Sequence, residues 1–381
     1  MSIRLLICAA GTGGHVYPAL AAAASFDAAA HMAKGSEATV SLLWVGTVNG
    51  MEAGLVRAAN IRFEAVRAAG VVGRGLWGGL AGCLQLALGI VQALLIMRRE
   101  RPHAVLVTGG YAAVPVALAA WLRRVPVLVY LPDILPGQAV RFVARLATRV
   151  CVTMDESIRA WRVPAAQVTG YPVRPELLRA RELSAASARI QLHLEPARTT
   201  LLVLGGSQGA RSINNALLAA APELVANGLQ ILHVTGARDW PELQHARELM
   251  SVETKAGYRS VAYLQTEMGV ALRAADLVVA RAGASCLGEF PLFGLASILV
   301  PYPYARRHQQ ANADAMVARG AAVRLDDENV AAELLPQILG LVGDVPRLAA
   351  LRSNAFKLAQ PAAAESLANA LLQLVPGDAQ C

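Results

Sequence analysis

The chain has 381 residues, a net charge of +8, 55% hydrophobic residues and only 16% charged residues. This length suits two domains, each large enough to bury a core. Aromatic residues make up 5% of the chain and no basic run is interleaved with them, which disfavours a nucleic-acid binder. The positive charge instead favours acidic partners, such as phosphates or an anionic lipid surface.

The cysteines are too scattered for a metal site or a disulfide framework. They are Cys8, Cys83, Cys151, Cys286 and Cys381, with no Cys-x-x-Cys spacing and mostly apolar neighbours. This pattern indicates reduced core residues in a cytosolic protein. The apolar run at the amino terminus breaks at glycine and is too short for a signal peptide.

The first predicted strand, residues 3–10, runs directly into the glycine-rich turn Gly11-Thr12-Gly13-Gly14-His15. Such a strand-turn-helix unit directs backbone N–H groups and the positive end of a helix at an anion. The helix end disfavours the imidazolium form, so His15 is a candidate general base. The alternative is a histidine that only hydrogen-bonds the turn.

A dinucleotide-binding site is disfavoured at this turn. Such a site needs an acidic residue at the end of the second strand, whereas this strand ends in Gly46-Thr47.

Residues 76–97 carry no charge and are bounded by Arg74 and Arg98. Their length could span a bilayer, but four glycines and two glutamines interrupt them within an α/β pattern. We expect a helix packed in the first domain and partly exposed on one face. A helix lying on a membrane surface, anchored by the arginines, is the alternative.

Strands alternate with helical stretches along both halves, which predicts parallel sheets covered on both faces. The predicted strands are 3–10, 40–46, 104–108, 126–131, 149–153, 200–204, 229–234, 260–264, 276–280 and 297–301. The predicted helices include 17–30, 115–122, 212–224 and 285–293, and the tail 348–374 also has helical character. Residues 170–175 have the composition of an interdomain linker.

A second strand, residues 201–204, runs into another glycine-rich turn, Gly205-Gly206-Ser207-Gln208-Gly209. The Ser207 hydroxyl and the Gln208 amide beside a cluster of N–H groups suit a diphosphate. A helix cap accounts equally well for the serine. Two such turns, about one domain length apart, predict two similar α/β domains facing each other across a cleft.

Two later segments suit a nucleotide sugar. The stretch 281–289 joins a strand end to a helix, where Glu289 can accept two ribose hydroxyls or simply favour the helix start. The loop 301–312 is rich in hydrogen-bonding side chains, with Gln309 and Asn312 on one helical face. The missing Asp-x-Asp pair disfavours a dedicated divalent-metal site.

These motifs together resemble glycosyltransferase family 28, which has the GT-B fold of two Rossmann-like domains. The segments that carry the resemblance are GTGGHVYPAL at 11–20, GGYAAVP at 109–115, ATRV at 147–150, TGYPVR at 169–174, GGSQGARSIN at 205–214, RAGASCLGE at 281–289 and HQQAN at 308–312. The match is nearly full length.

The resemblance implies a metal-free, cofactor-free enzyme of peptidoglycan synthesis at the cytoplasmic face of the cell membrane. Its donor is UDP-GlcNAc, and its acceptor is the C4 hydroxyl of MurNAc in undecaprenyl-diphosphoryl-MurNAc-pentapeptide (lipid I). The product is lipid II, formed with inversion at the anomeric carbon. The implied partners are these two substrates and an anionic membrane surface, with no nucleic acid.

The resemblance also implies a domain plan and residue roles. Residues 1–168 form the acceptor domain, 169–345 the UDP-GlcNAc domain, and 346–381 a helical tail packing back on the first domain. The implied site residues are His15 as base; Thr12, Gly13 and Gly14 at the sugar; Arg174, Ser207 and Gln208 at the phosphates; Leu264 at uracil; Ala284, Ser285, Cys286, Leu287, Gly288 and Glu289 at the nucleotide; and Gln309 and Asn312 at the GlcNAc.

The chain departs from the family pattern at Asp133, where an asparagine is usual. An ionised aspartate accepts hydrogen bonds but cannot donate them. Our hypothesis is that Asp133 orients His15 or takes the acceptor proton itself. The rival functions are a GT-B transferase with another lipid acceptor, a UDP-GlcNAc epimerase of similar fold, and a non-enzymatic nucleotide-sugar sensor.

Overall fold

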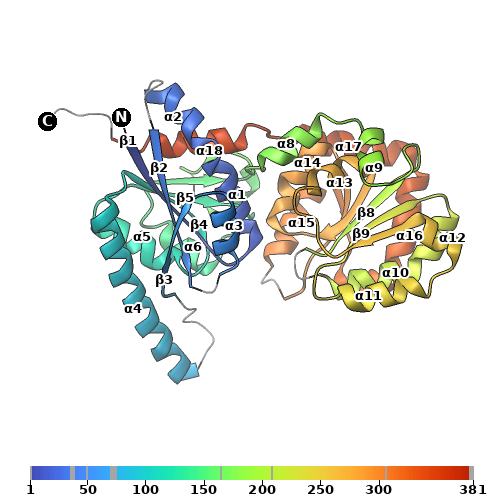
Figure 1. Ribbon diagram of the computed structural model, residues 1–381, viewed down its shortest axis with the longest axis horizontal. Helices are drawn as coiled ribbons and strands as arrows, with labels where there is room; N and C mark the ends of the chain where they lie inside the picture. The colour runs from blue at the N-terminus through green and yellow to red at the C-terminus, as the bar shows by residue number, and fades with distance from the viewer. Residues whose placement is uncertain are drawn as a thin grey trace. The chain divides into compact units, whose positions relative to one another are not determined.

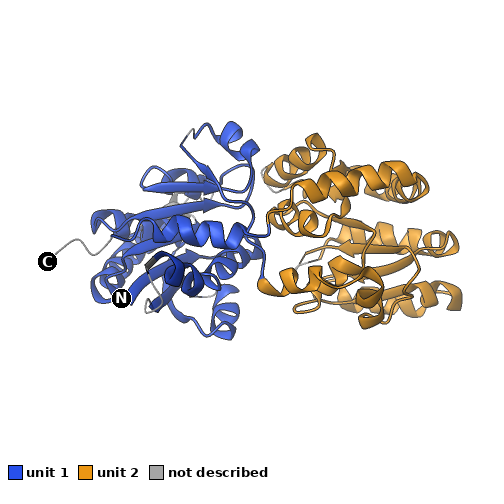
Figure 2. Cartoon of the chain, turned by 90° about the horizontal axis from the view of Figure 1, so that it is seen from above, with its two compact units in different colours: residues 1–174, 361–381 blue, residues 175–360 orange. Residues whose placement is uncertain are grey.

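The computed structural model describes residues 2–34, 39–48, 50–68, 75–163, 165–206, 209–304 and 307–376. The chain forms two compact units, which Figure 2 shows in two colours. Unit 1 comprises residues 1–174 and 361–381, and unit 2 comprises residues 175–360.

Unit 1 is built on a seven-stranded parallel sheet with the order β3-β2-β1-β4-β5-β6-β7. The strands are β1 (Ser2–Ala9), β2 (Thr39–Thr47), β3 (Arg62–Val66), β4 (Ala104–Gly109), β5 (Val127–Leu131), β6 (Arg149–Val152) and β7 (Gln167–Val168). The chain winds outward in opposite directions from β1 and β4, so the strand order reverses between these two. Ligands of doubly wound sheets bind beyond the carboxyl ends of the strands at such a point.

Helices cover both faces of this sheet (Figure 1). They are α1 (Gly13–Ala23), α2 (Phe26–Lys34), α3 (Glu52–Ala58), α4 (Gly75–Glu100), α5 (Ala113–Leu122), α6 (Gln138–Val143), α7 (Asp155–Trp161) and α18 (Ala363–Leu372). Strand β1 alternates between the two cores: Ile3, Leu5 and Ile7 pack with α1, α2 and α18, whereas Leu6 and Cys8 pack with α4, α5 and α6. This period of two buries both sides of an almost wholly apolar strand.

Unit 2 repeats the plan with six parallel strands in the order β10-β9-β8-β11-β12-β13. The strands are β8 (Thr200–Leu204), β9 (Gln230–Val234), β10 (Tyr258–Val261), β11 (Leu277–Arg281), β12 (Ala296–Val300) and β13 (Ala322–Arg324). The helices are α8 (Pro175–Arg181), α9 (Ala185–Gln191), α10 (Arg211–Ala226), α11 (Trp240–Glu248), α12 (Val252–Gly257), α13 (Met268–Ala274), α14 (Glu289–Phe293), α15 (His308–Ala318), α16 (Val330–Gly343) and α17 (Val345–Lys357), with short 3-10 helices η1 (Ala284–Leu287) and η2 (Asp327–Asn329). Here the order reverses between β8 and β11.

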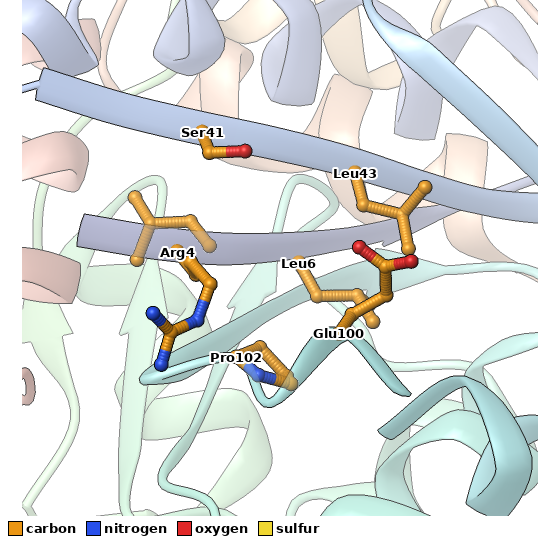
Figure 3. Close-up of a pocket in the computed structure, with 7 residues that line it drawn as sticks. Arg4, Leu6, Ser41, Leu43, Glu100 and Pro102 are labelled. Carbon is orange, nitrogen blue, oxygen red and sulfur yellow. The ribbon is translucent and has the colours of Figure 1, made fainter. Parts of the chain in front are cut away.

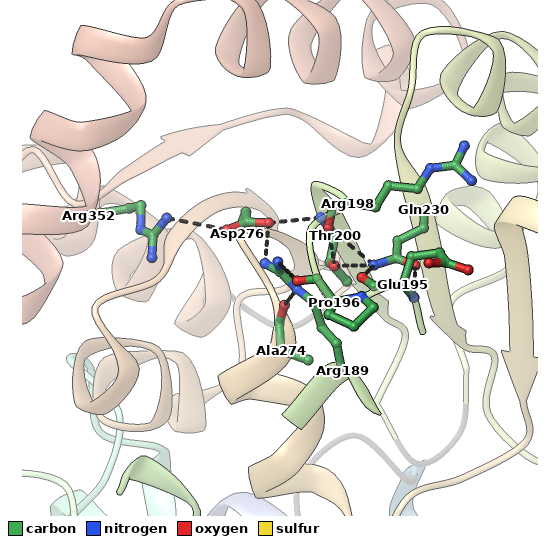
Figure 4. Close-up of polar contacts among 9 residues, drawn as sticks. All are labelled: Arg189, Glu195, Pro196, Arg198, Thr200, Gln230, Ala274, Asp276 and Arg352. Atoms are coloured by element: carbon green, nitrogen blue, oxygen red, sulfur yellow. Dashed lines mark hydrogen bonds and ion pairs between the residues drawn. The ribbon is translucent and has the colours of Figure 1, made fainter. Parts of the chain in front are cut away.

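A polar cluster joins the start of the unit 2 sheet to α9 and α17 (Figure 4). The buried Arg189 guanidinium donates to the carbonyls of Ala274 and Pro196 and to Asp276 Oδ2, the last at 2.7 Å. The same Asp276 oxygen accepts the backbone N–H of Thr200 at 2.8 Å. Because each nitrogen of this buried guanidinium donates a hydrogen bond, the cluster ties β8 and β11 together at the edge opposite the second glycine-rich turn.

The prediction of two doubly wound parallel sheets is confirmed, with local corrections. The helix expected over 17–30 breaks at Ala24 and Ser25 into α1 and α2. The helix expected over 285–293 is η1 followed by α14, because Gly288 has φ −131° and ψ −45°, which is not helical. Three short edge strands, β3, β7 and β13, escaped prediction because they lack a long apolar run.

The compact units differ from the predicted domain ranges at both boundaries. Residues 169–174 pack in unit 1, where the Gly170 carbonyl accepts a hydrogen bond from the buried Tyr130 hydroxyl at 2.9 Å. In the tail, α17 belongs to unit 2 and only the part from residue 361 belongs to unit 1. There α18 packs on α1 and α2.

We predict that Leu371→Ala lowers the free energy of unfolding of unit 1 by about 2–5 kcal/mol, because a fully buried side chain leaves a cavity. Urea denaturation followed by pulsed hydrogen exchange of β1 measures this loss. Asn369→Ala, at an exposed position of the same helix, is the control and should change little. Equal effects of the two substitutions would contradict the role given to α18.

Candidate functional site

The first glycine-rich turn lies at the strand-order reversal of unit 1, between the ends of β1 and β4. Gly11 has φ +97°, a conformation that favours glycine. Thr12 caps α1 and its carbonyl accepts the backbone N–H groups of His15 and Val16. The sequence prediction that His15 opens a helix after this turn is therefore confirmed.

The imidazole of His15 lies against the backbone of β4. A Cβ atom on Gly109 would come within 2.5 Å of His15 Cδ2 and 2.7 Å of Nε2, so only glycine leaves room for the ring. The Thr108 hydroxyl donates to the His15 carbonyl at 2.8 Å. Strand β4 thus determines where the ring lies, which sequence spacing alone did not indicate.

The Thr12 hydroxyl lies 3.1 Å from His15 Nδ1. When Nδ1–H donates to this hydroxyl, the lone pair of a neutral ring is on Nε2, and Nε2 can accept a proton. The contact is therefore compatible with the tautomer that a general base requires, and it restricts the orientation of the ring.

Two other predicted site residues, Asp133 and Arg174, belong to unit 1. Asp133 follows β5, the neighbour of β4, so it is at the same sheet edge as His15. The Arg174 guanidinium stacks 4.5 Å from the ring centroid of Tyr17 in α1. Their predicted roles stay predictions.

The second glycine-rich turn follows β8 and precedes α10 in unit 2. Gly206 and Gly209 have φ +78° and +81°. A Cβ atom on Gly209 would approach the Thr235 carbonyl to 2.7 Å and Asp239 Oδ2 to 2.9 Å. Ser207 and Gln208 lie outside the described residues.

A buried polar network supports this turn from behind. Asn214 Nδ2 in α10 donates to the Thr235 carbonyl at 3.0 Å and to Asp239 Oδ2 at 2.9 Å. Its oxygen lies 2.9 Å from His233 Nε2, and His233 Nδ1 lies 2.6 Å from the Tyr258 hydroxyl. The Asn214 oxygen can only accept, so Nε2 carries the proton and Nδ1 accepts from Tyr258.

Beyond β11, the predicted nucleotide segment follows the strand end through η1 into α14. Ala284, Cys286 and Leu287 are buried, whereas Ser285 and Gly288 are partly exposed. Glu289 is the first residue of α14 and is mostly buried, which agrees with a carboxylate at a helix start.

Arg281, at the end of β11, has a linking role that sequence reasoning missed. Its guanidinium donates to Asp327 Oδ1 at 2.6 Å and to the Ser212 hydroxyl at 2.9 Å. It also stacks 5.3 Å from the ring centroid of Tyr302. Arg281 therefore joins α10, η2 and the loop after β12; only its place in the 281–289 motif could have drawn attention to it.

The predicted sugar-binding residues of α15 differ in placement. Gln309 Oε1 accepts the backbone N–H of Tyr302 at 2.9 Å. Asn312 is fully buried and its amide donates to the Ala282 carbonyl at 3.0 Å, so a direct sugar contact would require this side chain to move. Leu264, also buried, follows β10.

Elsewhere the described residues add little chemistry. They contain no group of three or more His, Cys, Asp or Glu side chains arranged to hold a metal ion. A small cavity, lined by residues that include Arg4, Ser41 and Glu100, lies toward the amino-terminal ends of β1 and β2 (Figure 3). That edge is opposite the glycine-rich turn, so we assign the cavity no part in the site.

Two doubly wound domains with a glycine-rich turn at each strand-order reversal have the architecture of the GT-B class of proteins. Residues 5–152 match the glycosyltransferase family 28 N-terminal domain, and residues 200–367 match the family 28 C-terminal domain. The chain belongs to glycosyltransferase family 28, as its sequence motifs predict.

Bacterial relatives match over nearly the full length. Proteins from a Roseiflexus species and Moorella thermoacetica are 39% and 38% identical, covering 98% of this chain and 95% and 99% of theirs. Both are named UDP-N-acetylglucosamine–N-acetylmuramyl-(pentapeptide) pyrophosphoryl-undecaprenol N-acetylglucosamine transferase. The crystal structure of Acinetobacter baumannii MurG superimposes with a TM-score of 0.75 at 27% identity, covering 97% of this chain and 99% of that one.

A UDP-GlcNAc 2-epimerase from Neisseria meningitidis has a TM-score of 0.67 at 12% identity, covering 98% of this chain and all of that one. At this identity the likeness is one of fold alone.

We predict that unit 2 loses stability as the pH falls from about 6.5 toward 3. Burial lowers the pKa of His233 to about 3, so the unfolded chain binds a proton in this window that the folded chain excludes. Within this range the free energy of unfolding falls by up to about 1.4 kcal/mol per pH unit. His233→Gln should reduce this slope, whereas His245→Gln, at an exposed position of α11, should keep it. Urea denaturation with pulsed exchange of β9 measures both; equal slopes would contradict the prediction.

Proposed function

We propose that the protein transfers GlcNAc from UDP-GlcNAc to the C4 hydroxyl of MurNAc in lipid I, forming lipid II. Its near-full-length similarity to relatives named for this transfer supports the proposal. The observation that carries the proposal is that different side chains lie at the strand-order reversals of the two units. In unit 1 the ring of His15 is held against β4, which suits a base. In unit 2 the glycine-rich turn is accompanied by segments that contain Glu289 and Gln309, which suit a nucleotide sugar.

The mechanism is a single displacement at the anomeric carbon. The acceptor O4 gives its proton to His15 Nε2 and attacks C1, while the bond from C1 to the UDP oxygen breaks. The acceptor and UDP lie on opposite faces of C1, so its configuration inverts. In this mechanism Nδ1–H of His15 donates to the Thr12 hydroxyl, so that Nε2 is unprotonated, and Gly13 and Gly14 let the backbone approach the sugar.

Most of the residues that we assign to the donor belong to unit 2. Ser207, Gln208 and Arg174 bind the diphosphate and stabilise the charge that develops on departing UDP without a metal. The backbone at Leu264 contacts uracil, the segment from Ala284 to Gly288 lines the nucleotide, and Glu289 accepts the ribose hydroxyls. Gln309 binds GlcNAc, and Asn312 supports this segment through the Ala282 carbonyl.

The proposal is tested by incubating the protein with UDP-GlcNAc and a short-chain lipid I analogue, then measuring disaccharide and UDP. Parallel reactions with diacylglycerol, and with no acceptor, test the other-acceptor transferase and the epimerase. Binding of UDP-GlcNAc without turnover on lipid I would overturn the proposal.

We predict that His15→Ala keeps its affinity for UDP-GlcNAc and loses kcat by about 10²–10⁴-fold, as expected on removing a general base.

The variant Asp133→Asn separates the two candidate bases, His15 and Asp133. If Asp133 orients His15 or takes the proton, the variant loses kcat; full activity across pH would exclude both roles. Isothermal titration with UDP-GlcNAc and steady-state kinetics supply the two measurements.

We also propose that the protein lies on the anionic cytoplasmic face of the membrane through one face of α4. Leu84, Leu88, Val91 and Leu95 are exposed and spaced at four, three and four residues, which places them on one helical stripe. Arg98 is exposed at the carboxyl end of the helix, where a basic residue favours an anionic surface. Arg99 is also exposed, but it pairs with Glu64 and Glu100.

The opposite face of α4 holds the helix on unit 1. Ala93, Ile96 and Met97 are buried in its core. A Cβ atom on Gly89 would overlap the Arg67 carbonyl, and Gln92 Oε1 accepts the Arg67 N–H at 2.8 Å. By length and composition alone, the segment Gly82–Glu100 could cross a membrane, and 28% of its apolar stretch is buried in the protein. These packing contacts favour surface contact over a span.

We predict that Leu84→Ser with Leu95→Ser weakens binding to phosphatidylglycerol-containing vesicles by about tenfold or more, since each exposed leucine contributes apolar burial. The control pair is Leu249→Ser with Val252→Ser, at sites in unit 2 that are 77% exposed against 62% and 60% for Leu84 and Leu95. Vesicle sedimentation measures binding. An equal loss in both pairs, or none in the first, would contradict the role of the stripe.

A further inference from the structure

A fully buried carboxylate, Glu52, lies behind the first glycine-rich turn. It is the first residue of α3 and is 0% exposed. Glu52 Oε1 accepts both the backbone N–H and the hydroxyl of Thr47, each at 2.8 Å, and Oε2 accepts the N–H of Gly11 at 3.4 Å. The side chain therefore joins the end of β2 to the turn that follows β1.

The surrounding backbone leaves space for this carboxylate. A Cβ atom on Gly46 would come within 2.8 Å of Glu52 Oε1, and one on Gly50 would overlap the carboxylate. Burial, and then the charge of Glu52, raise the pKa of the neighbouring Cys8 thiol. Each hydrogen-bond partner donates to Glu52, which is the pattern that an ionised carboxylate requires when it is removed from water.

The turn is thus held from both adjacent strands. On the β4 side, Thr108 binds the His15 carbonyl and the Ala10 N–H donates to the Gly109 carbonyl at 3.2 Å. On the β2 side, Glu52 holds Gly11, the residue directly before Thr12. Since Thr12 contacts His15 Nδ1, a shift at Gly11 moves the hydroxyl that orients the histidine ring.

We propose that Glu52 is a positioning residue for the transfer step, which fixes Thr12 and His15 through the N–H of Gly11; this rests on the proposed function. Its carboxylate takes one of the turn's N–H groups, the kind of group that a phosphate would bind in a nucleotide-binding turn. Because Glu52 takes this N–H group, a phosphate cannot bind it, and we assign the turn of unit 1 to the reacting groups instead.

Glu52→Gln separates positioning from packing because it keeps the shape of the side chain. Its amide oxygen can still accept both donors of Thr47, but its amide group then presents N–H toward the N–H of Gly11. Thr47→Val is the matched control: it removes one donor to Glu52 and leaves the contact with Gly11.

We expect Glu52→Gln to lower kcat by about tenfold or more, since small displacements of reacting groups cost rate. The KM for UDP-GlcNAc should stay within about twofold, because most of the donor residues are in unit 2. Thr47→Val should keep kcat within about threefold. Circular dichroism checks that each variant is folded at the assay temperature.

Unchanged kcat in folded Glu52→Gln, or an equal loss in Thr47→Val, would overturn the inference. If Glu52→Gln is unfolded, Glu52→Asp replaces it, and loss of fold in both overturns positioning in favour of a purely structural carboxylate. Absence of transfer by the unsubstituted protein would instead refute the proposed function, so the two failures are distinguishable.

Discussion

The candidate site of unit 1 depends on the close approach of the His15 ring to the backbone at the end of β4. Gly109 has no side chain, so the imidazole can lie against the main chain where strand order reverses. An imidazole held there by its own carbonyl, by Thr12 and by the strand loses little rotational freedom when substrate arrives. The same parallel sheet brings the ends of β1, β4 and β5 to one edge, which places Asp133 on that edge too.

Both domains have a glycine-rich turn between a strand and a helix, but different side chains surround the two turns. In unit 1, Glu52 occupies a turn N–H and the neighbouring helix presents a histidine. In unit 2, the corresponding helix α10 is held from behind by a network of Asn214, His233, Tyr258 and Asp239. Arg281 links the same helix to the loop after β12. The side chains around each turn therefore distinguish the two sites more than the glycines do.

The sequence was sufficient for the fold class, both glycine-rich turns and the family, because apolar strands and glycine motifs are local signals. It failed where partners are distant in the chain. The second strand ends without an acid, yet Glu52 supplies one from the next helix, 41 residues after Gly11. Arg281 contacts Ser212 across 69 residues, and the amide of Asn312 donates to the Ala282 carbonyl across 30 residues, while its role at the sugar stays a prediction. Neither relationship has a spacing that periodicity could detect.

The return of the chain to unit 1 after residue 360 has a consequence for biosynthesis. Unit 2 is one continuous segment, whereas the core of unit 1 includes Leu367, Leu371 and Val375 from the last part of the chain. During synthesis the core of unit 1 therefore stays incomplete until nearly the whole chain has left the ribosome. Until then, the surface that α18 will cover is exposed to solvent. Unit 2 can complete its core earlier, so the domain made second is the one able to finish folding first.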